Sequence, residues 1–574
     1  MAKFFIGLVT GVVLVFLSLL LLFAALLRFR EKPPQIADNS VLVLRLAGEL
    51  PEKAPVELPE FLGGGRPGLT VSNVWMSLRM AAADSHIKAV VLEPDGLVAG
   101  WAKLEELRGD LEQFRKSGKP VFAYLRTPTT RDYYVALAAD RIFTGPEEPL
   151  MLKGLRAEMM YFKKTLDKIG VSVDVEHAGK YKDFGDMFTR SDMSSETREV
   201  MTGVVDDLYG NLVARIAESR KKSPPEVQAI IDQGPFTAQQ ALKAGLLDQL
   251  SFEDEMWSAL KDKLHSGEPI RVSAEKYVKV PPENAGLPGK SRIALVIGEG
   301  DIVRGAADDN GADESSLTSN GFDKLLVQVA GDSTIKGVVV RIDSPGGEVT
   351  ASDDIWRQMN LLSKKKPTVI SMSDLAASGG YYMAMTGDAI VAEPGTLTGS
   401  IGVVFGKPNL HGLYDKLGIT KDSLQRGKHA DIDSDYTPLT PEERDLLRQG
   451  IDESYRDFLS KVANARHHSV EEIDRVAQGR VWLGSQAKSR GLVDELGGLD
   501  TAIDLVKKKA NIPVGEQVTL VTYPPRRSII DVIMKRSQED MLESRLAQAF
   551  GRMPFHAWMK GGYLRLMANW FEVK

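Results

Sequence analysis

Ser378 stands in a run of small residues that could hold a catalytic serine. The run reads Ala-Ala-Ser-Gly-Gly and follows a buried-looking stretch that begins at Thr368. We predict a strand, a tight turn, a helix and a second strand over residues 368–404, with the serine at the first turn. Small neighbours leave the hydroxyl uncrowded, and the next backbone N–H is free to donate to an oxyanion. A packing turn has the same composition, so the serine needs a base before it indicates catalysis.

The base is found by comparing two halves of the chain, because the sequence repeats itself. Asp84-Ser-His-Ile-Lys-Ala-Val-Val-Leu corresponds to Asp332-Ser-Thr-Ile-Lys-Gly-Val-Val-Val, and Gly245-Leu-Leu-Asp corresponds to Gly491-Leu-Val-Asp. The offset stays near 248 residues through most of the body. We therefore predict a tandem duplication of one domain of about 230 residues.

The two copies differ at the turns where chemistry would take place. In the second copy a strand ends in Ser344-Pro-Gly-Gly, whose glycines let backbone amides approach a ligand because they have no Cβ. The first copy reads Asp95-Gly-Leu-Val there and has lost the double glycine. The turn Ser378-Gly-Gly corresponds to Thr130-Arg-Asp in the first copy, where the larger side chains would obstruct such a turn. Only the second copy keeps the serine and the glycine turns.

The first copy keeps a lysine that the second copy has lost. The segment Gly-Lys-Tyr-Lys ending at Lys182 aligns without a gap to the Gly-Lys-His-Ala ending at Ala430. A lysine serves as a base for serine when burial or a nearby cation lowers its pKa. Most lysines are solvated at the surface, but these reciprocal losses favour one active site made from Ser378 and Lys182. Lys428 is the rival base, since positions two apart share a face of an extended strand.

Each copy alternates short Val/Ile-rich strands with amphipathic helical stretches, for example at residues 102–117 and 352–364. This alternation is typical of βαβ units and predicts an α/β fold with a mainly parallel sheet. The domain boundaries that we predict are a first repeat at 41–265, a linker at 266–291, a second repeat at 292–520 and a tail at 521–574. The tail carries aromatic and basic residues, which suit a partner-docking or membrane-surface segment or a helix pair packed on its own domain.

An uncharged apolar run covers residues 4–27, which at about 1.5 Å per residue is enough to cross a hydrocarbon core of about 30 Å. A signal peptide has a shorter apolar region and a small-residue cleavage site, and no Ala-x-Ala sequence follows here. We predict an uncleaved transmembrane anchor followed by a stiff, proline-containing linker at 28–40. The positive charges after the run, at Arg28, Arg30 and Lys32, mildly favour a cytoplasmic body.

Composition excludes several classes of function. The net charge of -6 and the isoelectric point near 5.9 argue against nucleic acid as a partner. The chain has no cysteine, which excludes disulfides, thiolate metal sites and a cysteine nucleophile. Of its eight histidines, none are spaced as metal ligands on an obvious helix, and the adjacent His467 and His468 are expected at the surface. No metal or other cofactor is expected.

Four motifs, in this order along the chain, together resemble the signal peptide peptidase A (protease IV) family in its long, duplicated form. They are Gly179-Lys-Tyr-Lys, Ser344-Pro-Gly-Gly, Ala377-Ser-Gly-Gly-Tyr-Tyr and Leu397-Thr-Gly-Ser-Ile-Gly. The resemblance covers roughly residues 40–520 and the anchor. It implies tandem ββα superhelix domains of the crotonase/Clp type and a Ser–Lys endopeptidase that degrades signal peptides left in the membrane.

The resemblance also implies roles for particular residues. Ser378 would be the nucleophile and Lys182 the general base, with Ser400 as the hydroxyl that orients the lysine. Gly379 and Gly347 would supply the oxyanion N–H groups. Family members are single-pass proteins of the bacterial inner membrane with the body on the outer, periplasmic face, against the weak charge bias here. They assemble into homo-oligomers, so a tetramer is implied.

Two other functions remain open at this point. A crotonase-type enzyme acting on acyl-CoA would use the same paired amides, but it needs an acidic residue and no serine after the turn. A non-catalytic membrane scaffold would predict decay in both copies, whereas one complete set of residues survives here. The sequence leaves open the cleavage preference, the role of the tail, and whether the serine meets a lysine of its own chain.

Overall fold

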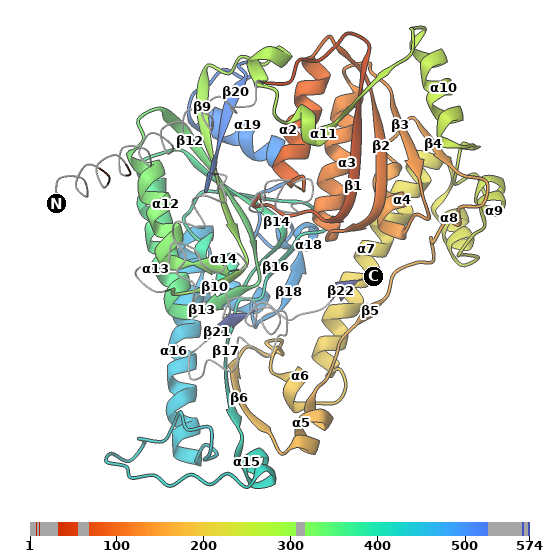
Figure 1. Ribbon diagram of the computed structural model, residues 1–574. Helices are drawn as coiled ribbons and strands as arrows, with labels where there is room; N and C mark the ends of the chain where they lie inside the picture. Colours follow the sequence, from red (N-terminus) through yellow and green to blue (C-terminus); the bar gives the residue numbers. More distant parts are fainter. Residues whose placement is uncertain are drawn as a thin grey trace.

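The computed structural model describes residues 33–54, 68–305, 316–525, 565–567 and 572–573, together with Gly7 and Gly11. The predicted anchor at 4–27 therefore lies, except for two glycines, outside the described residues. Among the residues that are described, none of the helices is both long and apolar enough to span a membrane. Figure 1 shows two α/β bodies side by side with a narrower arm below them.

The first body is built on a parallel sheet in the order β7-β4-β3-β2-β1-β8. The middle of its central strand β2, Val90 to Leu92, is fully buried, as expected for a sheet covered on both faces. The strands are β1 (Ser40–Glu49), β2 (Ile87–Val98), β3 (Val121–Leu125), β4 (Arg141–Thr144), β7 (Gln249–Leu250) and β8 (Ile270–Ser273). Its helices are α2 (Val71–Ala83), α3 (Trp101–Arg115), α4 (Thr130–Ala136), α7 (Ser195–Arg220), α8 (Pro224–Ile231), α9 (Ala238–Lys243), α10 (Glu253–Leu264) and α11 (Ala274–Tyr277).

The second body repeats this plan on a larger sheet, in the order β18-β16-β14-β12-β9-β20, with β15 and β19 attached beside β14. Its strands are β9 (Ser291–Glu299), β12 (Ile335–Ser344), β14 (Thr368–Ala377), β15 (Ala389–Ala392), β16 (Leu397–Gly399), β18 (Val481–Leu483), β19 (Glu495–Leu496) and β20 (Val518–Tyr523). Its helices are α12 (Ser319–Gly331), α13 (Val349–Ser363), α14 (Gly379–Met383), α15 (His411–Leu417), α16 (Pro441–Arg466), α17 (Val470–Val476), α18 (Gly484–Lys488) and α19 (Leu499–Lys509).

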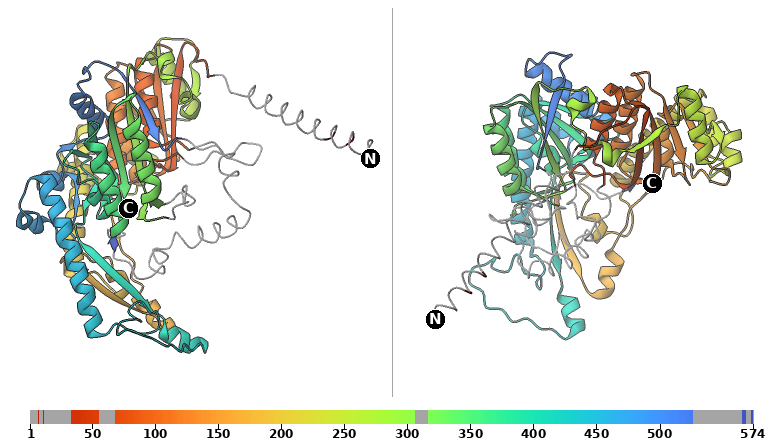
Figure 2. Two further views of the ribbon diagram at one scale, coloured as in Figure 1. Left: turned by 90° about the vertical axis from the view of Figure 1, so that its left-hand side faces the viewer. Right: turned by 45° about the horizontal axis from the view of Figure 1, so that its top comes forward.

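A third sheet joins the two bodies, in the order β11-β10-β13-β21-β17-β6. Strand β6 (Ser172–Ala178) comes from the first repeat and pairs antiparallel with β17 (Val403–Asn409) of the second, over seven residue pairs. Figure 2 shows these two strands running together in the arm, beside α16. The remaining strands are β10 (Asp301–Val303), β11 (Ser316–Thr318), β13 (Gly346–Glu348) and β21 (Arg565–Met567). Strand β6 therefore adds a strand of the first repeat to the edge of a sheet of the second repeat.

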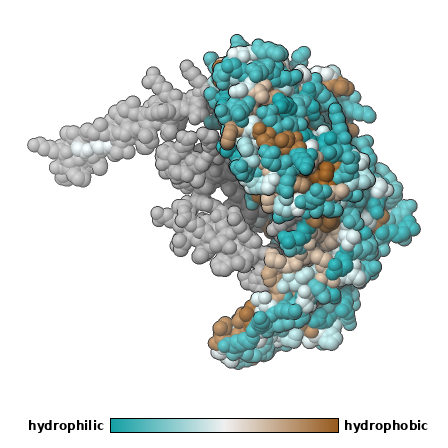
Figure 3. All heavy atoms as spheres, turned by 90° about the vertical axis from the view of Figure 1, so that its right-hand side faces the viewer, coloured by the Kyte–Doolittle hydropathy of each residue, from teal (hydrophilic) through white to brown (hydrophobic). Residues whose placement is uncertain are grey.

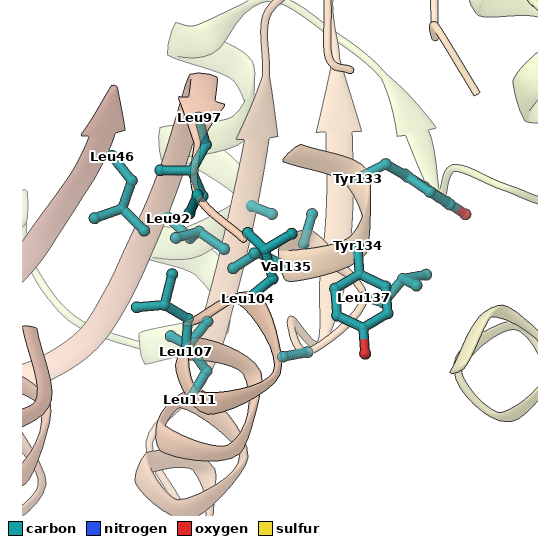
Figure 4. Packing of buried hydrophobic residues seen from close by; sticks show 14 of the residues in the cluster. Leu46, Leu92, Leu97, Leu104, Leu107, Leu111, Tyr133, Tyr134, Val135 and Leu137 are labelled. Atoms are coloured by element: carbon teal, nitrogen blue, oxygen red, sulfur yellow. The ribbon is translucent and has the colours of Figure 1, made fainter. Parts of the chain in front are cut away.

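Each body has its own core. In the first, leucines of β2 and α3 pack against the helix that bears the Tyr133-Tyr134 pair (Figure 4). In the second, the equivalent pair Tyr381-Tyr382 packs beneath β12 and β14. Tyr133 donates to the Leu246 carbonyl and Tyr381 donates to the Leu492 carbonyl, so the two cores keep the same buried hydrogen bond.

Two segments differ from the boundaries that the sequence suggested. Residues 266–291, expected to form an extended linker, contain β8 and α11, and β8 extends the first sheet by pairing with β1. Strand β8 has only four residues, which is too short for the alternating pattern of a strand to stand out in the sequence. Most of the tail lies outside the described residues, but its described part completes β20 up to Tyr523 and forms two further strands. These are β21 and β22 (Glu572–Val573), and β22 pairs with β5 (Ala157–Glu158) of the first repeat.

Candidate active site

Ser378 lies at the elbow between β14 and α14, in the arrangement predicted from the sequence. Its backbone has φ 55° and ψ -113°, which is a strained conformation for a residue with a side chain. The Ser378 N–H donates to the Gly399 carbonyl at 2.8 Å, and the Tyr382 N–H donates to the Ser378 carbonyl at 2.8 Å. These bonds hold the serine at the start of α14, where free N–H groups follow it. Such strain persists at sites that the surrounding structure over-determines.

The two glycine turns are packed against each other. A Cβ on Gly379 would lie 3.0 Å from the Gly347 nitrogen and 2.6 Å from Ser352 Oγ. A Cβ on Gly347 would lie 1.9 Å from the Ile302 carbonyl oxygen. A side chain at either position would clash, and the Gly347 nitrogen lies close to Gly379, the residue that follows Ser378. This is the arrangement that an oxyanion hole requires.

Ser344 fixes the shape of the second glycine turn. Its hydroxyl donates to the Gly300 carbonyl at 2.7 Å and accepts from the Gly346 N–H at 3.2 Å. Gly346 has φ 101°, in the region that favours glycine. The serine side chain therefore connects the turn that precedes Gly347 to Gly300, which lies between β9 and β10.

Lys182 reaches the serine from the other repeat. It follows β6 by four residues, and the Tyr181 N–H donates to the Gln478 carbonyl at 2.7 Å. The Lys182 Nζ lies 2.7 Å from Ser378 Oγ and donates to the carbonyl and hydroxyl oxygens of Ser400 at 3.0 Å each. All three side chains are essentially buried. The structure brings together the five residues singled out in the sequence, within one chain.

Burial lowers the pKa of Lys182 well below its ordinary value of 10.5, against the opposing charge of Asp183. A neutral amine at hydrogen-bond distance from a serine hydroxyl is able to accept its proton. Asp183 itself is buried, which raises its pKa to about 6, and it accepts a hydrogen bond from Thr197. The lysine and its neighbouring carboxyl are therefore both held nearer to neutrality than in water.

Lys428, the rival base, lies at the surface. Its side chain is 69% exposed and forms an ion pair with Glu442 at 2.5 Å. Ala430 lies in the same exposed stretch. The predicted surface pair His467 and His468 is likewise exposed. Within the described ranges, His, Asp and Glu side chains nowhere gather in threes as a metal site would need.

One residue near the site was missed in the sequence, and it too comes from the first repeat. Lys103, at the start of α3, donates to Asp343 at 2.7 Å and lies 3.8 Å from Asp374. These two carboxylates precede Gly347 and Ser378 by four residues each. Their charges raise the pKa of Lys103 above its ordinary value although burial opposes this, so the lysine stays charged. Its counterpart in the second repeat is Ala351, and that reciprocal loss was the signal that could have revealed it.

The lysine bridges the two strands where their ladder is irregular. Strands β12 and β14 pair regularly up to Ile342 and Met372, and the next pair is Ser344 with Ala376. Between these pairs, Asp343 accepts from the Leu375 N–H at 3.1 Å. Bulges of this kind re-aim side chains beside active sites. The side-chain bonds of Asp343 therefore replace the missing ladder bonds and set the spacing of the two turns.

The fold joins two α/β domains of one kind, and its candidate site holds a buried serine beside a buried lysine and two glycine turns. The sequence profile described as Peptidase family S49 matches residues 113–266 and 360–513, one segment in each repeat. The chain therefore belongs to peptidase family S49 and is a serine peptidase with a duplicated S49 domain. The profile described as Clp protease matches residues 314–392 in the second repeat.

Curated relatives agree with this assignment over most of the chain. The chain is 35% identical to "Serine protease SPPA, chloroplastic" of Arabidopsis thaliana, covering 87% of this chain and 73% of that protein. It is 30% identical to "Protease 4" of Haemophilus influenzae, over 87% of this chain and 84% of that protein. It is 33% identical to "Protease 4" of Salmonella typhi, over 80% of this chain and 74% of that protein. Membership of this peptidase family argues against the two alternatives, an acyl-CoA enzyme and a non-catalytic scaffold.

Proposed function

We propose that this chain is a membrane-anchored endopeptidase with a Ser378–Lys182 dyad, which degrades cleaved signal peptides and other unfolded apolar peptides. The observation that carries the proposal is the 2.7 Å separation of Lys182 Nζ and Ser378 Oγ in a buried site. The lowered pKa of the lysine supplies the neutral amine that the reaction needs. A relative in Enterococcus faecium, 33% identical over 38% of this chain, is described as a putative signal peptide peptidase.

The reaction runs in two halves. Ser378 Oγ attacks the peptide carbonyl while Lys182 takes the hydroxyl proton, and the resulting oxyanion accepts from the Gly347 and Gly379 N–H groups. Lys182 then gives its proton to the amine as the C–N bond breaks, which leaves an acyl-enzyme. Water, deprotonated by the lysine, hydrolyses the ester and restores the serine. Ser400 holds the amine in place through its two contacts at 3.0 Å.

An extended peptide backbone has a place beside the glycine turn. Strand β21 pairs antiparallel with β13, with Leu566 opposite Gly347, and it pairs with Val404 of β17 on its other side. A segment of this chain thus occupies the position of an added strand next to the predicted oxyanion amides. Strand addition gives backbone affinity without requiring a folded substrate. This supports unfolded peptides as substrates.

We further propose that residues 4–27 anchor the protein once in the bacterial inner membrane, with the body on the outer, periplasmic side. Their length and apolar character support this. The repeats would have the crotonase-type ββα superhelix, and the protein would assemble as a homotetramer. A membrane location fits substrates that remain in the bilayer after precursor processing.

Detergent-solubilised full-length protein would be assayed on an apolar peptide with a signal-peptide sequence and, separately, on an acyl-CoA. Peptide cleavage that is absent in Ser378→Ala, with no thioester hydrolysis, is the expected result. A fluorophosphonate probe should label the unsubstituted protein and not the variant. Peptide cleavage that persists in Ser378→Ala would refute the dyad, and thioester hydrolysis without peptide cleavage would refute the proposed substrate class.

A further inference from the structure

The first repeat has no serine at its turn, but it still holds a strand of the tail. Strand β22 pairs antiparallel with β5, with Val573 opposite Ala157 (Figure 1). In the second repeat, β21 of the same tail pairs antiparallel with β17, with Arg565 opposite Val404. The offset of 248 relates Val404 to residue 156, which is next to Ala157. The two repeats therefore hold two segments of the tail in equivalent places.

We call these places the active strand site, where β21 lies beside β13 and β17, and the second strand site, where β22 lies beside β5. In the second strand site, Arg131 is the counterpart of Gly379, and its guanidinium donates to the Val573 carbonyl at 2.9 Å. Hydrogen bonds from a charged donor are stronger than those from a neutral amide. The first repeat thus has a side chain that binds a peptide carbonyl where the second repeat has a glycine.

The second strand site also accepts an apolar side chain. Val573 is 7% exposed and belongs to the core cluster of the first repeat, and Leu155 and Ala157 pack against the same cluster. Figure 3 shows this side of the molecule, where apolar patches interrupt the hydrophilic surface. Strand addition gives backbone affinity, and a place for a side chain gives selectivity. The site therefore suits an extended peptide with apolar residues.

One peptide is able to occupy both strand sites. Strand β21 ends at Met567 and β22 begins at Glu572, so five peptide units connect them. Five units span at most about 18 Å when fully extended. The two sites are therefore within reach of one extended segment no longer than residues 565–573.

We propose that the second strand site is a non-catalytic binding site for peptide substrates, with residues 572–573 as its resident ligand, and that a long unfolded peptide occupies it together with the active strand site. Two linked sites raise affinity without any new chemistry. The apolar region of a signal peptide, about 7–15 residues long, has the required length. The inference rests on the proposed peptidase function and adds a preference for long peptides.

Peptide length tests the second strand site without any cleavage. Full-length protein with Ser378→Ala is titrated in detergent with fluorescein-labelled apolar peptides of about five and about twelve residues, and anisotropy gives each Kd. Val573→Lys, added to this protein, places a cation beside Arg131 in a buried position and should release β22. The long peptide should then bind at least about tenfold more tightly than the short one. Equal Kd values for the two lengths would overturn the proposal.

Arg131→Met separates the second strand site from a longer contact with the active strand site. Added to the Ser378→Ala, Val573→Lys protein, it should remove most of the difference between the two peptides, because the carbonyl loses its charged donor. Arg126→Met is the matched control and should keep the difference, since Arg126 is exposed and pairs with Glu253 at 2.6 Å. A preference for the long peptide that survives Arg131→Met would overturn the assignment.

A photo-reactive residue locates the peptide without relying on Val573→Lys. The tail runs from the active strand site to the second one, so the carboxyl-terminal part of a long peptide is expected at β5. The long peptide carries benzoylphenylalanine near its carboxyl end or, in a second version, near its amino end, and is irradiated with the Ser378→Ala protein. The carboxyl-terminal probe should label the first repeat and the amino-terminal probe the second. Labelling of the second repeat alone by both probes would overturn the proposal.

Cleavage by the protein that retains Ser378 reports the proposed function separately. The ratio of short-peptide KM to long-peptide KM should rise in Val573→Lys, as the ratio of Kd values does. Length-dependent binding without cleavage would refute the peptidase and support the second strand site. Cleavage with no length dependence in Val573→Lys would refute the second strand site and support the peptidase.

Discussion

The two repeats hold their equivalent turns in different backbone conformations. Thr130 lies inside α4, whose first turn is capped by Thr129 and Asp132 in a reciprocal pair of hydrogen bonds. Ser378, its counterpart, lies just before α14 at φ 55°, and α14 has no side-chain cap. A helix cap stabilises by about 1 kcal/mol, and a strained residue costs about 1–3 kcal/mol. The first repeat has a relaxed, capped turn, and the second keeps a strained turn without a side-chain cap.

The carboxylate of Asp132 shows what the first repeat gained. It accepts from the Leu97 N–H at 2.9 Å, so the turn supplies a carboxylate to the end of strand β2. Its counterpart, Gly380, has no room for a side chain, since a Cβ there would lie 2.7 Å from the Ser344 carbonyl oxygen. The turn of the first repeat thus carries a carboxylate that accepts a hydrogen bond within its own repeat, whereas the turn of the second repeat has no side chain at this position.

The largest expected effect comes from breaking the dyad. Ser378→Ala and Lys182→Met should each lower kcat by at least about 10³-fold, because neither the nucleophile nor its base has a substitute. Lys428→Met, in the equivalent segment of the second repeat, should leave kcat unchanged, since that lysine is exposed. Steady-state cleavage of one peptide measures all three. Loss of activity in Lys428→Met, with activity retained in Lys182→Met, would place the base in the second repeat and refute the Ser378–Lys182 dyad.

Crowding the oxyanion turns should have the next largest effect. Gly379→Ala places a methyl group against Gly347 and Ser352, so we expect kcat to fall about 10²–10³-fold with a smaller change in KM. Gly109→Ala, within α3, meets no atom within 4 Å and serves as the control, with activity retained. Equal kcat in both variants would show that the two glycine turns do not form the oxyanion site.

The bridge from Lys103 is expected to matter about tenfold. Lys103→Met removes the cation between Asp343 and Asp374, and a misplaced turn costs catalysis more than binding. We expect a fall in kcat with KM nearly constant, and a loss of about 3–5 kcal/mol in stability because buried carboxylates lose their partner. Lys103→Arg should recover part of kcat. Lys119→Met is the control, since Lys119 binds only first-repeat carbonyl groups.

A fall in kcat of the same size in Lys119→Met would show that the effect of Lys103 is general instability of the first repeat. The measurements should be made well below the melting temperature of each variant. Unchanged kcat in Lys103→Met would show that the second repeat sets its own turns.

Reciprocal losses between the copies predicted the pairing of Ser378 and Lys182, because two positions that decay in opposite copies indicate one shared site. The family profile, which matches one segment in each repeat, and the curated relatives confirmed the family membership and the duplication. The bridge at Lys103 was missed although its signal was equally present, since a lysine within an amphipathic helix is usually solvated. The bulge between β12 and β14 could not be predicted, because strand register depends on contacts across the sheet.

The pH dependence of kcat/KM tests how the charge of Asp183 affects the protonation of Lys182. Protonation of Lys182 abolishes its function as a base, so kcat/KM should rise with pH through its lowered pKa. Asp183 opposes that lowering when it is ionised, above its own pKa of about 6. Asp183→Asn should therefore move the rise in kcat/KM to lower pH. A rise that stays in place, or moves to higher pH, would show that Asp183 does not act on the lysine through charge.

The smallest expected effect is on stability. The folded state lowers the pKa of Lys182 below 10.5, so the unfolded chain binds a proton that the folded protein does not hold. The penalty is absent above pH 10.5 and grows as the pH falls towards the folded pKa. Lys182→Met removes this penalty, so the variant is expected to be more stable at pH 7 than the unsubstituted protein.

We therefore expect Lys182→Met to be inactive and yet to melt at a higher temperature than the unsubstituted protein, with a gap that widens as the pH is lowered from 10 to 7. Ala430→Met, at the equivalent exposed position of the second repeat, should leave the melting temperature unchanged within about a degree. A gap that is constant with pH would mean that packing, and not the buried amine, separates the two proteins. A gap that widens would show that the buried amine of Lys182, which the first repeat contributes to the site, lowers the stability of the protein as the pH falls.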